Sequence, residues 1–197
     1  MTGAVLNTGV NISGETIVQL ILHAIGEDPD REGLRETPAR VVKAWGEWFD
    51  GYKIDPAEVL KTFADGAELC GDELVVVEGI DVYSFCEHHM APFFGKAWVA
   101  YIPDSRVVGL SKLARLVDVF AHRLQVQERL TNQIANALDE HLQPKGVGVL
   151  LRCTHFCMCS RGVNKQGSTT TTSALRGAIR EKPEARNEFM GIVLGGR

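Results

Sequence analysis

Cysteine and histidine gather at two places that lie far apart in this sequence. The first is the run Cys86-Glu87-His88-His89, which directly follows an apolar, strand-like segment over residues 74–85. The second spans residues 153–159, where cysteine or histidine occupies every other position. Thiolate sulfur and neutral imidazole nitrogen are the ligands that zinc prefers in proteins. The two clusters therefore predict one zinc site to which both contribute.

The spacing within the first cluster favours particular ligands. Cys86 and His89 lie three residues apart, so a turn can curl them around one ion and leave His88 free. One more ligand from the second cluster would give three protein ligands and an open position, which is the pattern of catalytic zinc. If the downstream segment is a regular strand, its cysteine and histidine side chains share one face. Spacing alone does not choose among the three downstream thiols, which are Cys153, Cys157 and Cys159.

Several of the polar residues also have an ordinary structural explanation. Isolated buried cysteines usually belong to the core, and Cys70 and Cys153 are expected there. Glu128 would simply be an acidic residue favoured by the helix dipole at a helix start. The threonines at 169–172 are good strand formers and favour a structural role. Charged residues that share one helix face usually point to solvent, which is the simpler reading of Arg40 and Lys43.

Composition limits the classes of function. The chain has 197 residues, of which 45% are hydrophobic and 23% charged, and this fits one globular domain with at most a small appendage. A net charge of −4 argues against general nucleic-acid binding. No apolar run is long enough for a membrane span, and no signal peptide is evident. The five cysteines are odd in number and clustered, which favours a reducing, cytoplasmic setting.

Helical and strand periodicities alternate along the chain. Residues 1–14 show neither helical nor strand periodicity, so we expect a mobile N-terminus. A first helix is predicted over 15–25. A second is predicted to begin with an N-cap at Thr37 and to end near Gly51. Strands are predicted over 74–85, 94–102, 147–153 and 168–173, with the first two antiparallel. Further helices are predicted from a cap at Ser111, over 126–142, and over 183–193. Lys112 and Arg115 are expected in the first turn of the Ser111 helix, where cations oppose the dipole unless an anion binds there.

Seven motifs, taken in order, resemble one known family. They are Ser84-Phe85-Cys86-Glu87-His88-His89, Gly95-Lys96, Ala100-Tyr101-Ile102-Pro103, Gly109-Leu110-Ser111-Lys112, Val126-Gln127-Glu128-Arg129-Leu130, His155-Phe156-Cys157 and Thr169-Thr170-Thr171-Thr172-Ser173. In order and spacing, the stretch from about Thr37 to Val193 is similar to the zinc-dependent type of GTP cyclohydrolase I. The departures are few: Leu124 stands where the family usually has proline, and Cys159 adds a thiol beside the expected metal.

The resemblance implies a fold and an assembly. The fold would be α+β, namely the tunnelling fold, with a four-stranded antiparallel sheet, two helices on one side, and preceding N-terminal helices. A helical region over 1–72 would precede a catalytic domain over 73–197. Members of the family form homodecamers of two stacked pentamers with active sites at subunit interfaces. Their reaction converts GTP and water to 7,8-dihydroneopterin triphosphate and formate, the first step towards pterins and folate or 7-deazaguanines.

The resemblance also implies a role for each matching residue. The zinc ligands would be Cys86, His89 and Cys157, and the catalytic residues would be His88, His155 and Ser111. Glu128, with Gln127, would read the guanine base. The triphosphate would be held by five cations, which are Lys112, Arg115, Arg161, Arg40 and Lys43.

Physical chemistry agrees with these implied roles. Zinc supplies a water nucleophile at neutral pH, and His155 is a sensible general acid for guanine N7, which makes C8 more electrophilic. The carboxylate of Glu128 can accept the N1 and N2 hydrogens of guanine, which adenine does not present. Two other readings remain: another tunnelling-fold enzyme acting on a purine or pterin, and a non-catalytic assembly held by zinc. A purely structural site would not need His88, His155 or Ser111.

Overall fold

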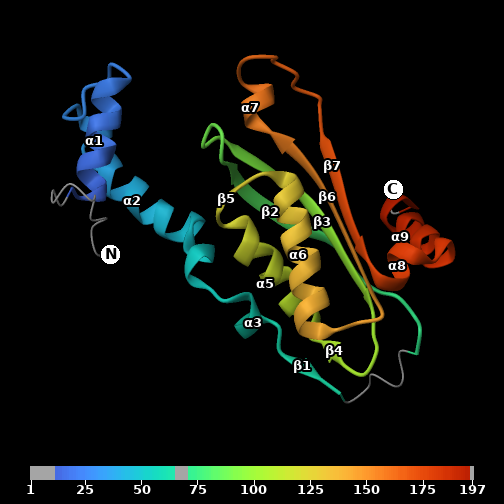
Figure 1. The fold of residues 1–197 in the computed structure, drawn as a ribbon. Coiled ribbons are helices and arrows are strands. Elements are labelled where there is room, and N and C mark those ends of the chain that lie inside the picture. The colour runs from blue at the N-terminus through green and yellow to red at the C-terminus, as the bar shows by residue number, and fades with distance from the viewer. Residues whose placement is uncertain (1–11, 65–70, 196–197) are drawn as a thin grey trace. The chain divides into compact units, whose positions relative to one another are not determined.

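The computed structural model of the protein describes residues 12–64 and 71–195 (Figure 1). The chain forms two compact units, Met1–Asp50 and Gly51–Arg197. The expected mobile start falls mostly, and Cys70 falls wholly, outside the described residues. Among the helices that the structure describes, none is both long and apolar enough to cross a membrane. The division into a helical region over 1–72 and a catalytic domain over 73–197 stays a prediction.

The N-terminal unit is helical, as its periodicity predicts. It contains α1 (Gly14–Ala24), the short 3-10 helix η1 (Glu32–Leu34) and α2 (Thr37–Trp48). The Ser13 side chain caps α1 by accepting a hydrogen bond from the backbone N–H of Thr16 at 3.1 Å. The prediction that Thr37 caps α2 is wrong by one residue. Glu36 is the N-cap, because its carbonyl already accepts the N–H of Arg40 at 3.1 Å.

The C-terminal unit carries the sheet and most of the helices. After the 3-10 helix η2 (Asp50–Lys53), its first elements are α3 (Pro56–Val59), β1 (Thr62–Phe63), β2 (Val75–Cys86), β3 (Pro92–Ile102) and β4 (Val107–Val108). They are followed by α5 (Leu110–Ala121), β5 (Leu124–Gln125), α6 (Gln127–Leu142), β6 (Gly146–His155) and α7 (Phe156–Cys159). The unit ends with β7 (Thr170–Arg176), α8 (Gly177–Glu181) and α9 (Pro183–Gly195).

The main sheet has five strands in the order β5-β2-β3-β6-β7. Four of them, β2, β3, β6 and β7, are antiparallel, as predicted. The prediction of a four-stranded sheet is wrong because β5 adds a two-residue parallel strand at the edge, where Leu124 pairs with Phe85 and Gln125 with Cys86. The connection from α5 to α6 thus runs along the end of β2. The α+β class is confirmed.

Two layers of helices cover the sheet (Figure 1). Alternate residues of β3 face opposite sides, as strand geometry requires: Ala97 and Val99 belong to the core under α5 and α6, and Ala100 and Ile102 to the core under α8 and α9. The predicted inward stripes of α5 and α6 are buried, at Leu113, Leu116, Val117, Phe120, Leu130, Ile134, Ala137 and Leu138. The predicted terminal helix over 183–193 is confirmed as α9, in which Phe189 has no exposed surface, and the short helix α8 precedes it.

Two local predictions near the expected site need correction. The strand does not continue through residues 153–159: β6 ends at His155, and the chain turns into α7, whose end is tied by the N–H of Ser160 to the carbonyl of Phe156 at 2.9 Å. Ser111 does not cap α5. Gly109 is the N-cap with extended backbone angles, and Ser111 lies within the first turn.

Candidate metal centre

A tight turn at the end of β2 brings the first two ligands together. Cys86 is the last residue of the strand, and its carbonyl accepts the N–H groups of His89 at 3.4 Å and of Met90 at 2.8 Å. Met90 takes the left-handed conformation that such a reversal needs, with φ 51°. The turn folds the imidazole of His89 back towards Cys86, with Nδ1 3.9 Å from Sγ.

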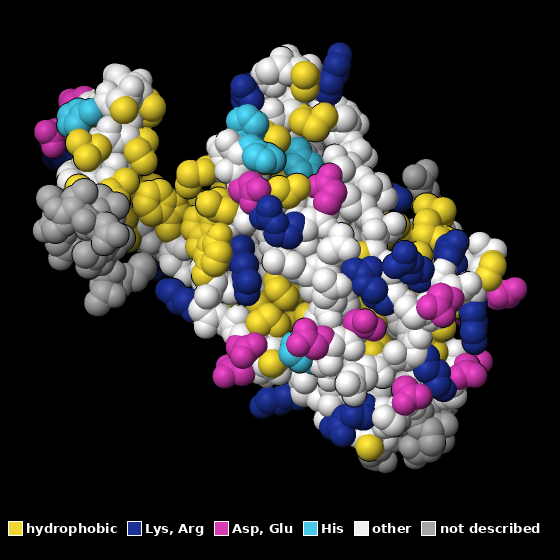
Figure 2. Space-filling model, viewed as in Figure 1, with side chains coloured by type: hydrophobic (Ala, Val, Ile, Leu, Met, Phe, Trp, Pro, Cys, Tyr) yellow, Lys and Arg dark blue, Asp and Glu magenta, His cyan; other side chains and the backbone are white. Residues whose placement is uncertain are grey.

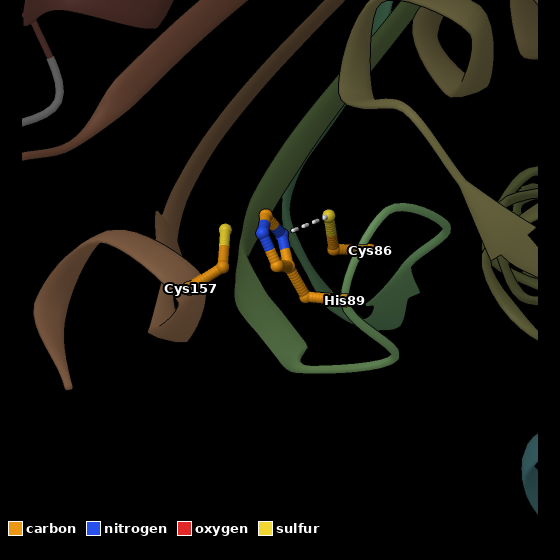
Figure 3. Close-up of side chains that lie close together, drawn as sticks. All are labelled: Cys86, His89 and Cys157. Atoms are coloured by element: carbon orange, nitrogen blue, oxygen red, sulfur yellow. Dashed lines mark hydrogen bonds between the residues drawn. The ribbon is translucent and has the colours of Figure 1, made fainter. Parts of the chain in front are cut away.

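Cys157 completes a group of three ligands. It lies on α7, the short helix that follows β6, and its thiol faces the other two side chains across the end of the sheet (Figure 3). The ligand atoms of Cys86, His89 and Cys157 all lie within 4.8 Å of one another. A tetrahedral zinc ion sits about 2.0–2.3 Å from such donors, so an ion can reach all three after small adjustments. The chemistry and spacing of these donors therefore fit a metal ion.

The other two downstream thiols do not join this group. Cys153 has 1% of its surface exposed and lies in the core, as expected for a structural cysteine. Burial raises the pKa of its thiol to about 12. Cys159 is also buried, and its sulfur approaches the carbonyl oxygens of Lys165 at 3.5 Å and Gln166 at 3.9 Å. Of the three downstream thiols, Cys157 is the one that the structure places close to Cys86 and His89, because the chain turns into α7 before it.

Charge and burial act on the thiol of Cys157. Burial and the neighbouring Cys86 raise the pKa of the Cys157 thiol, while the charge of Arg161 acts in the opposite direction. Two adjacent thiols disfavour a second negative charge in the absence of a cation. A bound divalent ion reverses this preference, because its charge favours both thiolates. The adjacent thiols of Cys86 and Cys157 therefore favour the binding of a cation between them.

Two more predicted residues lie against the metal group. Arg161 places Nη1 3.1 Å from Nε2 of His89. His88 is largely exposed, and its Nδ1 lies 3.9 Å from the sulfur of Cys86. Figure 2 shows histidine side chains gathered above the start of α6, with acidic and basic side chains beside them. Residues 86–89 thus place two candidate ligands, Cys86 and His89, and the largely exposed imidazole of His88 at a charged surface.

An ion pair that sequence reasoning missed ties this turn to α6. The two terminal guanidinium nitrogens of Arg129, Nη1 and Nη2, donate to the carboxylate of Glu87, with Nη2 3.0 Å from Oε1. The hydrogen bond from Arg129 holds the pKa of Glu87 below its usual value. The backbone N–H of Glu87 also donates to the carbonyl of Gln125 at 3.0 Å. The partners are 42 residues apart, and no sequence pattern links them.

His155 is the last residue of β6, two positions before Cys157, and it contacts Phe93 and Gln127. Its ring stacks on Phe93, with centroids 4.6 Å apart and planes inclined by 9°. Its Nε2 lies 2.7 Å from Oε1 of Gln127, a side chain with 1% exposure. Burial lowers the pKa of the His155 imidazole, and the charge of Glu128 partly offsets this. Glu128 itself is exposed in the first turn of α6.

The remaining predicted residues lie on two helices. Ser111, Lys112 and Arg115 are on α5, where the side chains of Ser111 and Arg115 are exposed. Lys112 is in the first turn as expected, but Arg115 is in the second, because the helix begins at Leu110. The other two predicted cations, Arg40 and Lys43, are exposed on α2 of the N-terminal unit, where Arg40 forms an ion pair with Glu36.

Comparison with known proteins identifies the family. Residues 14–194 match the family model described as GTP cyclohydrolase I. A GTP cyclohydrolase 1 from Nitrosospira multiformis is 59% identical over 175 residues, which is 89% of this chain and 91% of that protein. Its counterpart from a Janthinobacterium species is 59% identical over 93% of this chain and 91% of that protein. The one from Deinococcus radiodurans is 55% identical over 92% of this chain and 83% of that protein. This chain belongs to the GTP cyclohydrolase I family.

Proposed function

We propose that this protein converts GTP and water to 7,8-dihydroneopterin triphosphate and formate, the first step of pterin and folate synthesis or of 7-deazaguanine synthesis. The observation that carries the proposal is the convergence of Cys86, His89 and Cys157 within 4.8 Å in a chain of this family. Opening the imidazole ring of guanine requires water to attack C8, a poor electrophile. A site with three ligands, an open position and nearby imidazoles suits that task.

The metal in this proposal is zinc. Two thiolates and one imidazole form a soft donor set that suits zinc better than magnesium or calcium. When bound at such a site, zinc supplies a water nucleophile at neutral pH. Cys86 and His89 hold it from the turn after β2, and Cys157 holds it from α7. Because the ligands come from two elements, metal binding also fastens α7 to the end of the sheet.

The guanine base is recognised by Glu128 in this proposal. The carboxylate lies in the first turn of α6 and is exposed to a ligand. It can accept both the N1 and the N2 hydrogen of guanine, whereas adenine has no donor at N1. Gln127, which the family resemblance also assigns to the base, directly precedes it and is buried. The Arg129–Glu87 ion pair, one residue further on, keeps this turn of α6 beside the metal ligands.

Two histidines and a serine take the remaining catalytic roles. His155, stacked on Phe93, exchanges a proton with the base so that C8 becomes more electrophilic. His88, exposed beside Cys86, moves protons during hydrolysis of the formyl group or the later sugar rearrangement. Ser111, exposed at the start of α5, lies near the ribose in the bound state.

The triphosphate is held by cations that come from three elements. Arg161 approaches the metal ligand His89 and would place a phosphate close to the site. Lys112 and Arg115 lie at the beginning of α5, where free backbone N–H groups also favour anions. The family resemblance assigns Arg40 and Lys43, on α2 of the N-terminal unit, to the same role. In a chain with a net charge of −4, such a cluster gives a polyanion a local site.

The assembly in this proposal is a homodecamer with the tunnelling fold and interfacial active sites, in the cytoplasm. Two surfaces support self-association. Among the described strands β7 pairs only with β6, so its other edge is open to a further strand. Helix α1 and its C-cap expose the large apolar side chains Leu20, Ile21 and Ile25, a pattern typical of a helix that packs on a partner. The clustered thiols favour the reducing cytoplasm.

The test is to supply GTP to the zinc-loaded protein and to assay formate and, after oxidation and dephosphorylation, a pterin chromophore. The proposal expects both products from GTP and neither from ATP. A protein whose zinc is purely structural would yield no formate at full zinc occupancy, and that result would remove the proposed function. Formate from another purine would instead favour a different reaction on the same fold.

A further inference from the structure

The buried side chain of Gln127 has every hydrogen-bonding atom engaged within the protein. Its amide nitrogen lies 3.0 Å from the carbonyl oxygen of Thr170, 3.3 Å from that of Leu151 and 3.0 Å from the hydroxyl of Thr172. Its amide oxygen lies 2.7 Å from Nε2 of His155. Backbone carbonyls only accept hydrogen bonds, so the amide nitrogen must face them. The oxygen of Gln127 is therefore the atom that faces His155.

A chain of hydroxyl groups fixes the same orientation independently. Thr131 donates its hydroxyl hydrogen to the backbone carbonyl of Gln127 at 2.7 Å. The hydroxyl of Thr172 lies 2.6 Å from that of Thr131 and must therefore be the donor of this pair. With its hydrogen used, the oxygen of Thr172 accepts from the amide nitrogen of Gln127. One amide hydrogen thus goes to Thr172, and the other is shared between the two carbonyls.

The orientation of the Gln127 amide determines which nitrogen of the His155 ring carries a hydrogen. An amide oxygen only accepts, so the short contact to Nε2 requires a hydrogen on Nε2. That hydrogen is present in the neutral Nε2–H form of the imidazole and in the protonated ring, but absent from the neutral Nδ1–H form. No described residue forms a hydrogen bond with Nδ1. Proton exchange with a ligand is left to Nδ1.

We propose that Gln127 is a positioning residue that holds His155 in the Nε2–H form, so that His155 exchanges protons with the substrate through Nδ1. Gln127 then acts through His155 and does not read the guanine base. The stack on Phe93 fixes the plane of the ring, and the bond to Gln127 fixes its rotation within that plane. Reading guanine would require Gln127 to break buried hydrogen bonds, each of which is expensive to leave unmade. The exchange of protons with the substrate through Nδ1 rests on the proposed function. The assignment of a hydrogen to Nε2 of His155 does not depend on it.

Solid-state 15N NMR of the zinc-loaded protein, labelled with 15N-histidine, tests the form of the ring directly. The His155 signals are those missing from His155→Gln. We expect Nε2 of His155 to carry a hydrogen in the wild type. In Gln127→Met, which keeps the length of the side chain but removes its hydrogen bonds, we expect a share of the Nδ1–H form. An Nε2 without hydrogen in the wild type would overturn the proposal, and this measurement needs no Gln127 variant to fold.

Kinetics separates positioning from base recognition. Gln127→Met should lower kcat by about 100-fold, since a positioned proton-transfer group contributes ~10²–10⁴-fold. The KM for GTP should change little. Thr172→Val, which removes only one support of the amide, should show a smaller loss of the same kind. An increased KM with unchanged kcat, or acceptance of ATP, would mean that Gln127 reads the base and would overturn the proposal.

Gln125→Met is the matched control. Gln125 is a buried glutamine two residues earlier, and its amide donates to the carbonyl of Phe120 and to Gln133, without contact to His155. It should lose stability but keep kcat and the Nε2–H signal. The two proposals can fail separately. Absence of formate from a wild type with Nε2–H would remove only the proposed function, and formate from a wild type without that hydrogen would remove only the positioning.

Discussion

At the scale of single residues, the orientation of one thiol decides the metal group. Cys153, Cys157 and Cys159 lie within seven residues of one another in the sequence, yet Cys157 is the one that faces Cys86 and His89. Cys153 remains in β6 and points into the core, and Cys159 points to the carbonyl oxygens of the following loop. The difference arises because the chain changes from strand to helix at Phe156.

Replacing Cys157 by alanine should therefore abolish both metal binding and turnover. The variant removes one of three ligands, and two are too few for a stable zinc site. Metal content by mass spectrometry and formate release from GTP are the measurements. Cys159→Ala is the matched control and should retain zinc. If Cys157→Ala keeps zinc at wild-type stoichiometry, another thiol is the ligand and the proposed group is wrong.

Glu128→Gln should impair the use of GTP far more than folding. The amide replaces one acceptor oxygen by a donor that meets the N–H groups of guanine, so kcat/KM should fall by about 100-fold. Because the side chain is exposed, the free energy of unfolding should change by less than about 0.5 kcal/mol. Glu140→Gln, an exposed change at the other end of α6, should leave both quantities near wild type. A destabilised or dissociated Glu128→Gln protein would show a structural role.

At this scale the sequence predicted residue types better than contacts. Cys86 and His89 were predictable because three residues span one turn. The Glu87–Arg129 ion pair and the contact of Gln127 with His155 were not, because each joins distant parts of the chain whose register depends on the whole sheet. The buried state of Gln127 also contradicts what its polar type and its place at a helix start suggest.

At the scale of elements, the β3–β6 pair positions the two segments that carry the candidate ligands, because β3 follows the turn with His89 and β6 leads into α7 with Cys157. Ten residue pairs join these strands from Ile102 and Gly146 to Phe93 and His155, next to the site. Gly95 lies within this ladder opposite Cys153, and a Cβ atom there would meet the carbonyl oxygen of Arg152 at 2.0 Å. The close approach of the two backbones at this point requires glycine.

Gly95→Ala should therefore destabilise the fold by about 1–3 kcal/mol, as expected when added atoms force backbone shifts. The shift would separate β3 from β6 where Phe93 stacks on His155, so activity should fall as well. Urea denaturation gives the free energy of unfolding. Gly191→Ala is the control, since a Cβ there meets nothing within 4 Å and the residue lies in α9. Equal stability of Gly95→Ala and wild type would contradict the described register.

Element order was predictable, whereas element ends were not. The 3.6-residue period located α1, α5 and α6, and runs rich in strand-forming residues located the four long strands, of which β3 and β6 bury both faces. The ends depended on local hydrogen bonds that periodicity does not carry: Glu36 rather than Thr37 begins α2, and Gly109 rather than Ser111 begins α5. The strand β5 has two residues, too few to show a periodic pattern in the sequence. It is a strand only because it pairs with the end of β2.

At the scale of the whole molecule, the central prediction is the assembly. If active sites are shared between subunits, the active form must be a homo-oligomer, and the proposal is ten copies of the 21.6 kDa chain. Native mass spectrometry should give that multiple for the zinc-loaded protein. Dilution that dissociates the assembly should abolish turnover at the same concentration. A fully active monomer would contradict interfacial sites but not the metal group.

The measurement that tests the account most directly uses GTP labelled with 13C at C8. If the group formed by Cys86, His89 and Cys157 opens the guanine ring, the zinc-loaded protein should release the label as formate, one per pterin formed. Removal of zinc by a chelator should stop the release, and added zinc should restore it. Label retained in the purine, or formate released equally well without metal by the Cys157→Ala variant, would contradict the account.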